Sequence, residues 1–156
     1  MTAKIVSIVN QKGGVGKTTT AGNLATALAA IKHRVLLIDN DPQGNTSSGF
    51  GINKATSRTY YDVLTGEANF TEVILKTSIP NLDIVPADID MTTIEMTAIT
   101  RKNFKTMLKD HLKDVEHHYD YIIIDCPPAL GALTINALVA SSSLVIPLQC
   151  EFFALE

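Results

Sequence analysis

A glycine-rich segment near the start of the chain carries the residues with the clearest chemistry. Residues 10–19 read NQKGGVGKTT and follow directly on an apolar run. Glycines let successive backbone N–H groups turn toward one anion, and the start of a helix adds its dipole in the same direction. Lys17 can then reach the outer phosphates of a nucleotide, and the hydroxyl of Thr18 can bind Mg²⁺. The segment predicts a phosphate-binding loop, although a glycine-rich turn that binds nothing is the alternative.

One lysine departs from the general pattern of such loops. In the pattern Gly-x-x-x-x-Gly-Lys-Thr the first glycine would fall at Gln11, and Lys12 lies inside the loop instead. A lysine at this position is hard to direct at the same phosphates as Lys17. It could instead contact a phosphate held by a facing subunit, as an arginine finger acts in trans. A solvated loop lysine is the alternative interpretation.

Three aspartates follow apolar runs, where a phosphate-binding sheet needs ligands for metal and water. Asp39 and Asp41 stand in the segment DNDPQGN, and Asp125 ends the run YIIID. An aspartate after several apolar residues is the usual partner of Mg²⁺ through a water molecule, which is the role expected of Asp125. Asp41 could orient the attacking water, and Asp39 could support the hydration shell of the metal. Each aspartate alone is more often a strand-end or turn residue, so the interpretation depends on their occurring together with the loop.

Short apolar runs alternate with helical patterns along the chain. The runs are apolar mainly on successive residues rather than alternate ones, as in parallel strands covered on both faces, and they span residues 5–9, 35–38, 82–85, 121–124 and 144–146. Residues 18–31 place Ala21, Leu24, Ala25, Leu28 and Ile31 on one helical face, and residues 101–116 do likewise with Phe104, Met107, Leu108, Leu112 and Val115. Residues 40–57 predict a long loop. The alternation predicts an α/β fold, a doubly wound and mostly parallel sheet with helices on both faces and its ligand at the carboxyl ends of the strands.

Composition limits the class of protein. The 156 residues have a formal charge of −3 at pH 7 and 46% hydrophobic content, which fits one domain without a global basic excess. Cys126 and Cys150 are isolated, so neither a disulfide framework nor a cysteine metal cage is predicted, and a reducing cytoplasm fits best. No apolar stretch reaches the roughly 18 residues of a membrane span. Residues 151–156 lack a cap or breaker, which favours a C-terminally truncated domain.

Three segments together resemble the deviant Walker A ATPases of the ParA/MinD family. They are KGGVGKTT at residues 12–19, DNDPQGN at residues 39–45 and DCPP at residues 125–128. The DPQGN form, and the stretch from Pro147 to Glu156, are more similar to the ParA/Soj branch than to MinD. The resemblance covers the whole chain. It implies a P-loop ATPase fold, of which residues 1–156 form the N-terminal portion of a longer family domain.

The resemblance also implies roles for single residues. ATP and Mg²⁺ would be the cofactors. Lys12, Lys17 and Asp41 would act in catalysis. Thr18 and Asp125 would bind the metal, and they would be joined at the metal site by Asp39, whose expected role is given above. The nucleotide would be bound by Gly13, Gly14, Val15, Gly16, Lys17, Thr18 and Thr19, and Gly13 would also lie where two subunits meet.

The implied function is a dimer switch for plasmid or chromosome partition. Two subunits would enclose two ATP molecules, and slow hydrolysis would separate them. A ParB-like centromere-binding protein would stimulate hydrolysis, and the ATP-bound dimer would coat nucleoid DNA in the bacterial cytoplasm without sequence preference. DNA-binding residues and adenine contacts would lie beyond residue 156. No membrane partner is expected.

Other functions remain open at this point. A MinD-like or other cargo-positioning ATPase would share the fold, and a small-molecule phosphotransferase would have no use for Lys12. An iron–sulfur carrier is disfavoured because its cysteine pairs are missing. A series of basic residues comprises Arg101, Lys102, Lys105, Lys109 and Lys113. Because acidic residues interrupt this series, it predicts a solvated helix face. His117 and His118 predict a surface turn, since no third ligand stands at metal spacing.

Overall fold

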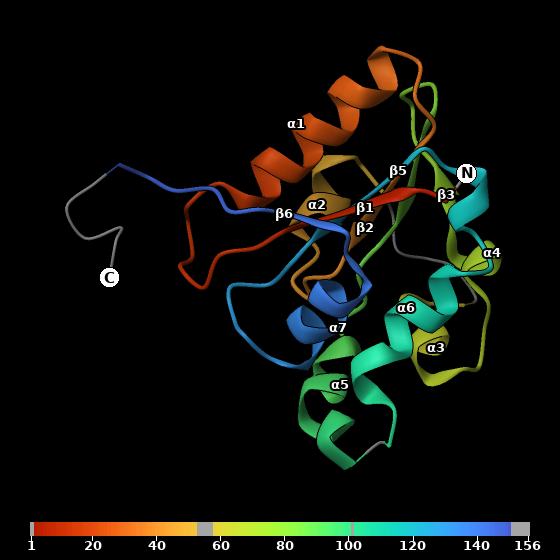
Figure 1. The fold of residues 1–156 in the computed structure, drawn as a ribbon, viewed down its shortest axis with the longest axis vertical. Coiled ribbons are helices and arrows are strands. Elements are labelled where there is room, and N and C mark those ends of the chain that lie inside the picture. The colour runs from red at the N-terminus through yellow and green to blue at the C-terminus, as the bar shows by residue number, and fades with distance from the viewer. Residues whose placement is uncertain (1, 53–57, 101, 151–156) are drawn as a thin grey trace.

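One six-stranded sheet runs through the described part of the chain (Figure 1). The computed structural model describes residues 2–52, 58–100 and 102–150. The strands are β1 (Lys4–Ile8), β2 (Val35–Asp39), β3 (Leu75–Lys76), β4 (Leu82–Val85), β5 (Tyr121–Asp125) and β6 (Ser143–Val145). They lie in the order β3-β4-β2-β5-β1-β6, and every neighbouring pair is parallel except β3 with β4. The predicted parallel sheet is confirmed, and the antiparallel edge strand β3 is an addition to it.

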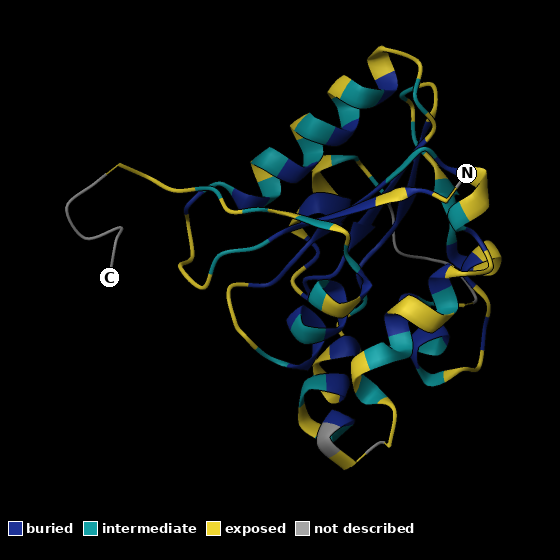
Figure 2. Ribbon diagram, in the orientation of Figure 1, coloured by how far each residue is buried: buried dark blue, intermediate teal, exposed yellow. Residues whose placement is uncertain are grey.

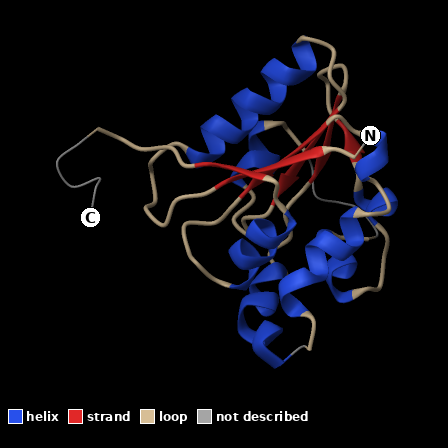
Figure 3. Ribbon diagram, viewed as in Figure 1, coloured by secondary structure: helices blue, strands red, loops and turns tan. Residues whose placement is uncertain are grey.

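Helices cover both faces of this sheet (Figure 3). The α-helices are α1 (Lys17–Ala30), α2 (Asn45–Gly49), α3 (Tyr60–Thr65), α4 (Phe70–Val73), α5 (Met91–Thr97), α6 (Met107–Leu112) and α7 (Ala132–Ala140). Short 3₁₀ turns occur at η1 (Ala98–Thr100), η2 (Phe104–Thr106) and η3 (Glu116–His118). Helix α1 packs on one face, while α3, α5, α6 and α7 pack on the other. The doubly wound architecture is therefore confirmed.

Two apolar clusters, one on each face, form the core. Along β2, Val35 and Leu37 face the α1 side, whereas Leu36 and Ile38 face the opposite cluster. Every residue of β2 is buried, and Figure 2 shows the central strands mostly in the colour of burial. Burial of successive side chains on opposite faces explains why β2 is apolar at four consecutive positions before Asp39.

The first predicted helix is confirmed in place, and Ala21, Leu24, Ala25 and Leu28 of its predicted buried face pack against the core. Helix α1 runs over Lys17–Ala30, and its fully packed residues are Ala21, Ala25 and Ala29. Ile31, predicted to be buried, is 67% exposed. The chain leaves the helix there, because Lys32 takes a left-handed conformation with φ of 70° and its N–H bonds to the carbonyl of Ala29.

The second predicted helix is shorter than expected. Regular α-helix covers only Met107–Leu112, flanked by η2 and η3, and Arg101 lies outside the described residues. The N–H of Leu108 donates to Oδ1 of Asn136 in α7 at 3.2 Å, so a tertiary contact supplies its partner. Leu108, Leu112 and Val115 are buried as predicted.

The long loop predicted over residues 40–57 contains the short helix α2, and residues 53–57 lie outside the described residues. Helices α3, α4, α5 and α7 were also not predicted. Two of them carry a start signal in the sequence: Thr59 with Asp62 and Asn69 with Glu72 form capping boxes at α3 and α4.

A carboxylate from α5 holds the start of α7. The N–H groups of Ala132 and Leu133 donate to Glu95 at 2.7 and 3.0 Å. These N–H groups have no partner within their own helix, so a charged acceptor satisfies them and favours the helix dipole. A Cβ on Gly131 would lie 2.0 Å from Oε2 of Glu95. The absence of a side chain at Gly131 therefore lets Glu95 reach the helix.

A double-mutant cycle can test the contact between Glu95 and the start of α7. Glu95→Ala should lower the free energy of unfolding by about 1–3 kcal/mol, because two backbone N–H groups lose a charged acceptor. Gly131→Ala should cost a similar amount by displacing the Glu95 carboxylate. In the Glu95→Ala background the alanine at 131 should cost less than about 0.5 kcal/mol. Urea denaturation of the four proteins measures the cycle, and additive losses would contradict the shared cause.

Candidate functional site

The carboxyl ends of three adjacent strands bring the candidate residues together. In the pairing of β2 with β5, Asp39 lies opposite Asp125, and in the pairing of β1 with β5, Ile8 lies opposite Asp125. The loop of residues 9–16 joins β1 to α1 at the same edge. The predicted loop and the predicted aspartates therefore converge at the position where open α/β sheets bind ligands.

The glycine loop is built for close approach of an anion. Gly14 and Gly16 have φ of 73° and 87°, a conformation that a glycine adopts without strain, and Gly16 precedes α1. The loop borders a cavity of about 340 Å³. The cavity is lined by Gly13, Gly14, Gly16, Lys17, Thr18, Thr19, Asp41, Asn45 and Pro128. Val15, also predicted to bind nucleotide, is buried at 6% exposure and is not among these lining residues.

Lys17 is held within the loop. Its side chain is buried, and Nζ donates to the carbonyl of Lys12 at 2.7 Å. Lys12 is itself exposed, and its N–H donates to Oδ1 of Asn10 at 2.9 Å. A buried ammonium bonded to a neutral carbonyl at a cavity wall is suited to exchange that acceptor for a phosphate oxygen. The trans role of Lys12 and the subunit contact of Gly13 stay predictions.

Asp125 has one satisfied carboxylate oxygen and one that is not. Oδ2 accepts hydrogen bonds from Oγ1 of Thr18 at 2.9 Å and from Oγ1 of Thr46 at 2.6 Å. Oδ1 is buried with no hydrogen-bond partner among the described residues. Burial raises the pKa of Asp125, and the hydrogen bonds from Thr46 and Thr18 oppose that rise.

This donor set fits Mg²⁺. The ion prefers oxygen ligands, keeps several waters and binds through few protein groups. A threonine hydroxyl beside an unpartnered carboxylate oxygen supplies such ligands, and an unsatisfied buried oxygen needs a partner of this kind. Within residues 2–52, 58–100 and 102–150, no group of three or more His, Cys, Asp or Glu is placed to hold a metal. A metal here would depend on Thr18, Asp125, water and the phosphates.

Asp39 has a different environment from Asp125. It is fully buried, and its Oδ2 accepts from the N–H of Ser47 at 2.7 Å and from Oγ of Ser47 at 2.5 Å. Burial raises the pKa of Asp39 to about 6, against the opposing hydrogen bonds from Ser47. These contacts attach α2 to the end of β2. The predicted part of Asp39 in a metal hydration shell stays a prediction.

Asp41 lies on the cavity wall. Its Oδ1 accepts from the N–H of Gln43 at 3.0 Å, which fixes the turn before Gly44. Asp41 thus lines the same cavity as the glycine loop. Its role in orienting water stays a prediction.

Sequence reasoning missed the hydroxyl residues of α2. Thr46 and Ser47 are buried against Asp125 and Asp39 respectively. They lie in a segment whose composition predicts only an irregular loop. The available signal was a run of hydroxyl residues directly after the DPQGN segment.

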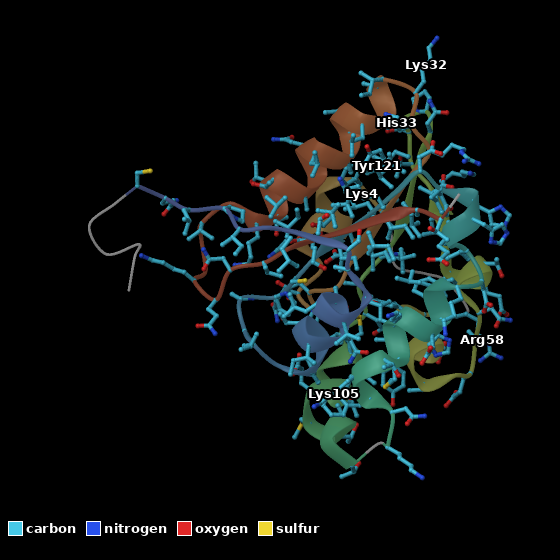
Figure 4. The ribbon with its side chains drawn as sticks, viewed as in Figure 1. Lys4, Lys32, His33, Arg58, Lys105 and Tyr121 are labelled. Atoms are coloured by element: carbon cyan, nitrogen blue, oxygen red, sulfur yellow. The ribbon has the colours of Figure 1, made fainter. Side chains whose placement is uncertain are left out.

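Exposed cations lie on separate elements. Lys105 comes from η2 and Lys4 from β1, whereas Lys32 follows the end of α1, away from Lys105 (Figure 4). Lys113 pairs with Asp110 at 2.7 Å, and His117 and His118 are exposed in η3. None of the helices in the described part of the chain has the length and apolar character needed to cross a membrane.

Known proteins are similar to this chain over nearly its whole length. The AAA domain family profile matches residues 3–156. The chain is 53% identical over 154 residues to the sporulation initiation inhibitor protein Soj of Bacillus subtilis, covering 98% of this chain and 61% of that protein. It is 52% identical over 158 residues to the chromosome partitioning protein ParA of Caulobacter vibrioides, covering 98% and 58%.

A solved structure extends the likeness to the fold. The crystal structure of cobyrinic acid a,c-diamide synthase from Mycobacterium smegmatis, with bound ATP analogue and magnesium, superposes with a TM-score of 0.92 at 36% identity. That match covers 97% of this chain and 62% of the synthase. The chain thus spans less than two thirds of the length of these relatives. Its description as a single domain stays a prediction.

The buried carboxylate of Asp39 predicts a pH dependence of stability. Its pKa is about 6 in the folded protein against an ordinary value of 3.8, so the folded state binds the proton more tightly than the unfolded chain does. Protonated Asp39 therefore contributes on the order of 3 kcal/mol to the free energy of unfolding below about pH 4, and this contribution is lost as the pH rises through about 6.

The variant Asp39→Asn keeps an acceptor for Ser47 but cannot ionise. Its free energy of unfolding relative to the natural protein should therefore increase from pH 4 to pH 7. Urea denaturation at pH values across this range measures the difference, and two parallel curves would contradict the account.

Proposed function

We propose that this chain binds ATP with Mg²⁺ and acts as a nucleotide-dependent dimer switch. The chain belongs to the AAA domain family and, within it, to the ParA/Soj-type partition ATPases, and this membership supports the proposal. Hydrolysis of ATP to ADP and phosphate resets the switch. The process served is the segregation of plasmid or chromosome copies. The observation that carries the proposal is the convergence of Lys17, Thr18 and the unpartnered oxygen of Asp125 beside the glycine loop.

The residues of the site divide the chemistry among them. Backbone N–H groups of the loop and the N-terminus of α1 bind the phosphates, and Lys17 exchanges the carbonyl of Lys12 for phosphate oxygens. Thr18 and Asp125 hold Mg²⁺, which when bound neutralises charge on the phosphate oxygens. Asp41, which lines the same cavity, orients the attacking water.

An apolar surface beside the loop supports the pairing of subunits. A second cavity, of about 310 Å³, includes Lys12, Leu130, Leu138 and Ile146 in its lining. Leu130 and Ile146 are 58% and 56% exposed. Large exposed apolar side chains next to a binding loop are typical of a surface that a partner covers. In the proposal a second subunit covers it, and Lys12 reaches the partner's phosphate.

The partners proposed for the whole protein follow from its family. A ParB-like protein and DNA stimulate slow hydrolysis, and the ATP-bound dimer associates with nucleoid DNA in the bacterial cytoplasm. Soj and ParA, which are named for sporulation and chromosome partition, support this proposal. The charge of −3 gives the chain no overall attraction for DNA, so a local basic surface must supply the contact.

A small-molecule enzyme that uses ATP is the second candidate. The observation that favours it is the likeness to a protein named as a cobyrinic acid a,c-diamide synthase. Such an enzyme would turn over its substrate without a facing subunit. Lys12→Ala should then leave turnover intact, whereas in a dimer switch the same change should abolish ATP-dependent pairing.

Two variants should separate nucleotide binding from hydrolysis. Lys17→Ala should weaken ATP binding about 10- to 100-fold, because a charged hydrogen bond to phosphate is lost. Asp41→Ala should bind ATP with nearly natural affinity and fail to hydrolyse it. Isothermal titration calorimetry and phosphate release measure the two properties. An equal loss of binding in both variants would contradict the division of roles.

Pairing should depend on the nucleotide. Light scattering of Asp41→Ala protein should show a doubled mass with Mg²⁺-ATP and a monomer with Mg²⁺-ADP, since the trapped ATP state cannot reset. Adding Lys12→Ala to this variant should restore the monomer in ATP, with nucleotide binding retained as the control. A monomeric Asp41→Ala protein in both nucleotides would count against a dimer switch in this chain.

A further inference from the structure

Two hydroxyls share one oxygen of Asp125, and only one of them belongs to the nucleotide loop. Oγ1 of Thr18 and Oγ1 of Thr46 both donate to Oδ2. When Thr18 binds Mg²⁺ through a lone pair of its oxygen, its O–H can still donate to Asp125, but the position of this hydroxyl then depends on the ion. The hydroxyl of Thr46 is the donor to Oδ2 whose position does not depend on the metal.

Thr46 is placed to hold the Asp125 carboxylate because α2 is fixed independently of the nucleotide loop. Its neighbour Ser47 donates to Asp39 through both N–H and Oγ, and the same Oγ accepts from the N–H of Ala87 at 3.0 Å. Ser47 is fully buried and Thr46 is 2% exposed. The helix is thereby attached to the ends of β2 and β4, and the direction of the Thr46 hydroxyl is set by that attachment.

We propose that Thr46 is a positioning residue for Asp125, which keeps Oδ2 bonded and so directs the unpartnered Oδ1 toward the metal site. The inference rests on the proposed function, since it concerns how the chain binds Mg²⁺ with ATP. It assigns a role to the short helix after the DPQGN segment. Groups that orient a metal-facing ligand in this way typically affect metal affinity 10- to 100-fold.

A merely structural role for Thr46 leads to a different expectation. If the hydroxyl only satisfied a buried oxygen, its removal would lower stability and leave the Mg²⁺ requirement of nucleotide binding unchanged. A positioning role changes the Mg²⁺ requirement while nucleotide binding without metal stays the same. The two roles are therefore separable by titration of folded protein.

The test compares Thr46→Val with the natural protein. Affinity for a fluorescent ATP analogue is measured first in EDTA and then over a series of Mg²⁺ concentrations. Thr46→Val should bind in EDTA within about twofold of the natural protein, while its Mg²⁺ midpoint rises about tenfold or more. Thr46→Ser, which keeps the hydroxyl, should restore the natural midpoint.

Ser48→Ala is the matched control in the same helix. It removes a hydroxyl that bonds to the carbonyl of Gly44 at 2.9 Å and has no bond to Asp125. Its Mg²⁺ midpoint should match that of the natural protein. A raised midpoint here would mean that general loosening of α2, not the Thr46 hydroxyl, sets the metal requirement, and would overturn the inference.

Thr46→Ala is measured alongside, because valine places a methyl group against the carboxylate and that variant could fail to fold. A natural Mg²⁺ midpoint in either folded variant lacking the hydroxyl would overturn the inference and leave the proposed function standing. Binding of the analogue by natural protein that is independent of Mg²⁺ would instead overturn the proposed function, and the inference with it.

Discussion

The register of β2 against β5 places two buried carboxylates, Asp39 and Asp125, opposite each other, and the rest of the site is arranged around that pair. Burying a charge is costly unless hydrogen bonds compensate it. Ser47 supplies them for Asp39, and Thr18 with Thr46 supplies them for Asp125. Because Ser47 and Thr46 are adjacent, one short helix serves both acids. Hydrogen bonds satisfy Oδ2 of Asp39, whereas Oδ1 of Asp125 is left without a partner among the described residues. Of the two acids, Asp125 therefore has the oxygen available to a metal.

The glycine loop contains a buried charge of the opposite sign, and this charge also has a hydrogen-bond partner. The Lys17 ammonium is buried near Asp125, and it donates to a carbonyl of its own loop. Binding of a nucleotide then exchanges one set of hydrogen bonds for stronger, charge-assisted ones and requires little rebuilding. The left-handed conformations of Gly14 and Gly16 keep the backbone in the required shape. The site is thus largely formed before any ligand arrives.

Much of the fold could be predicted from sequence because its signals are local. Short, mainly apolar runs predict β1, β2, β4, β5 and β6 to within one residue at either end, and the glycines and lysine predict the loop. What could not be predicted depends on contacts between residues far apart in the chain. Helix α2 depends on Asp39, the start of α6 on Asn136, and the start of α7 on Glu95. The pairing of Thr46 with Asp125, separated by 79 residues, has no local signal at all.

The central claim is that the nucleotide replaces the present partner of Lys17 and that the metal binds Thr18 beside Asp125. A crystal structure of the chain with Mg²⁺ and a non-hydrolysable ATP analogue tests it most directly. The account predicts that Nζ of Lys17 leaves the carbonyl of Lys12 for the phosphates, and that Oγ1 of Thr18 binds the metal through a lone pair. A nucleotide bound elsewhere, or bound at the loop with Lys17 still on the carbonyl of Lys12 and no metal on Thr18, would contradict it.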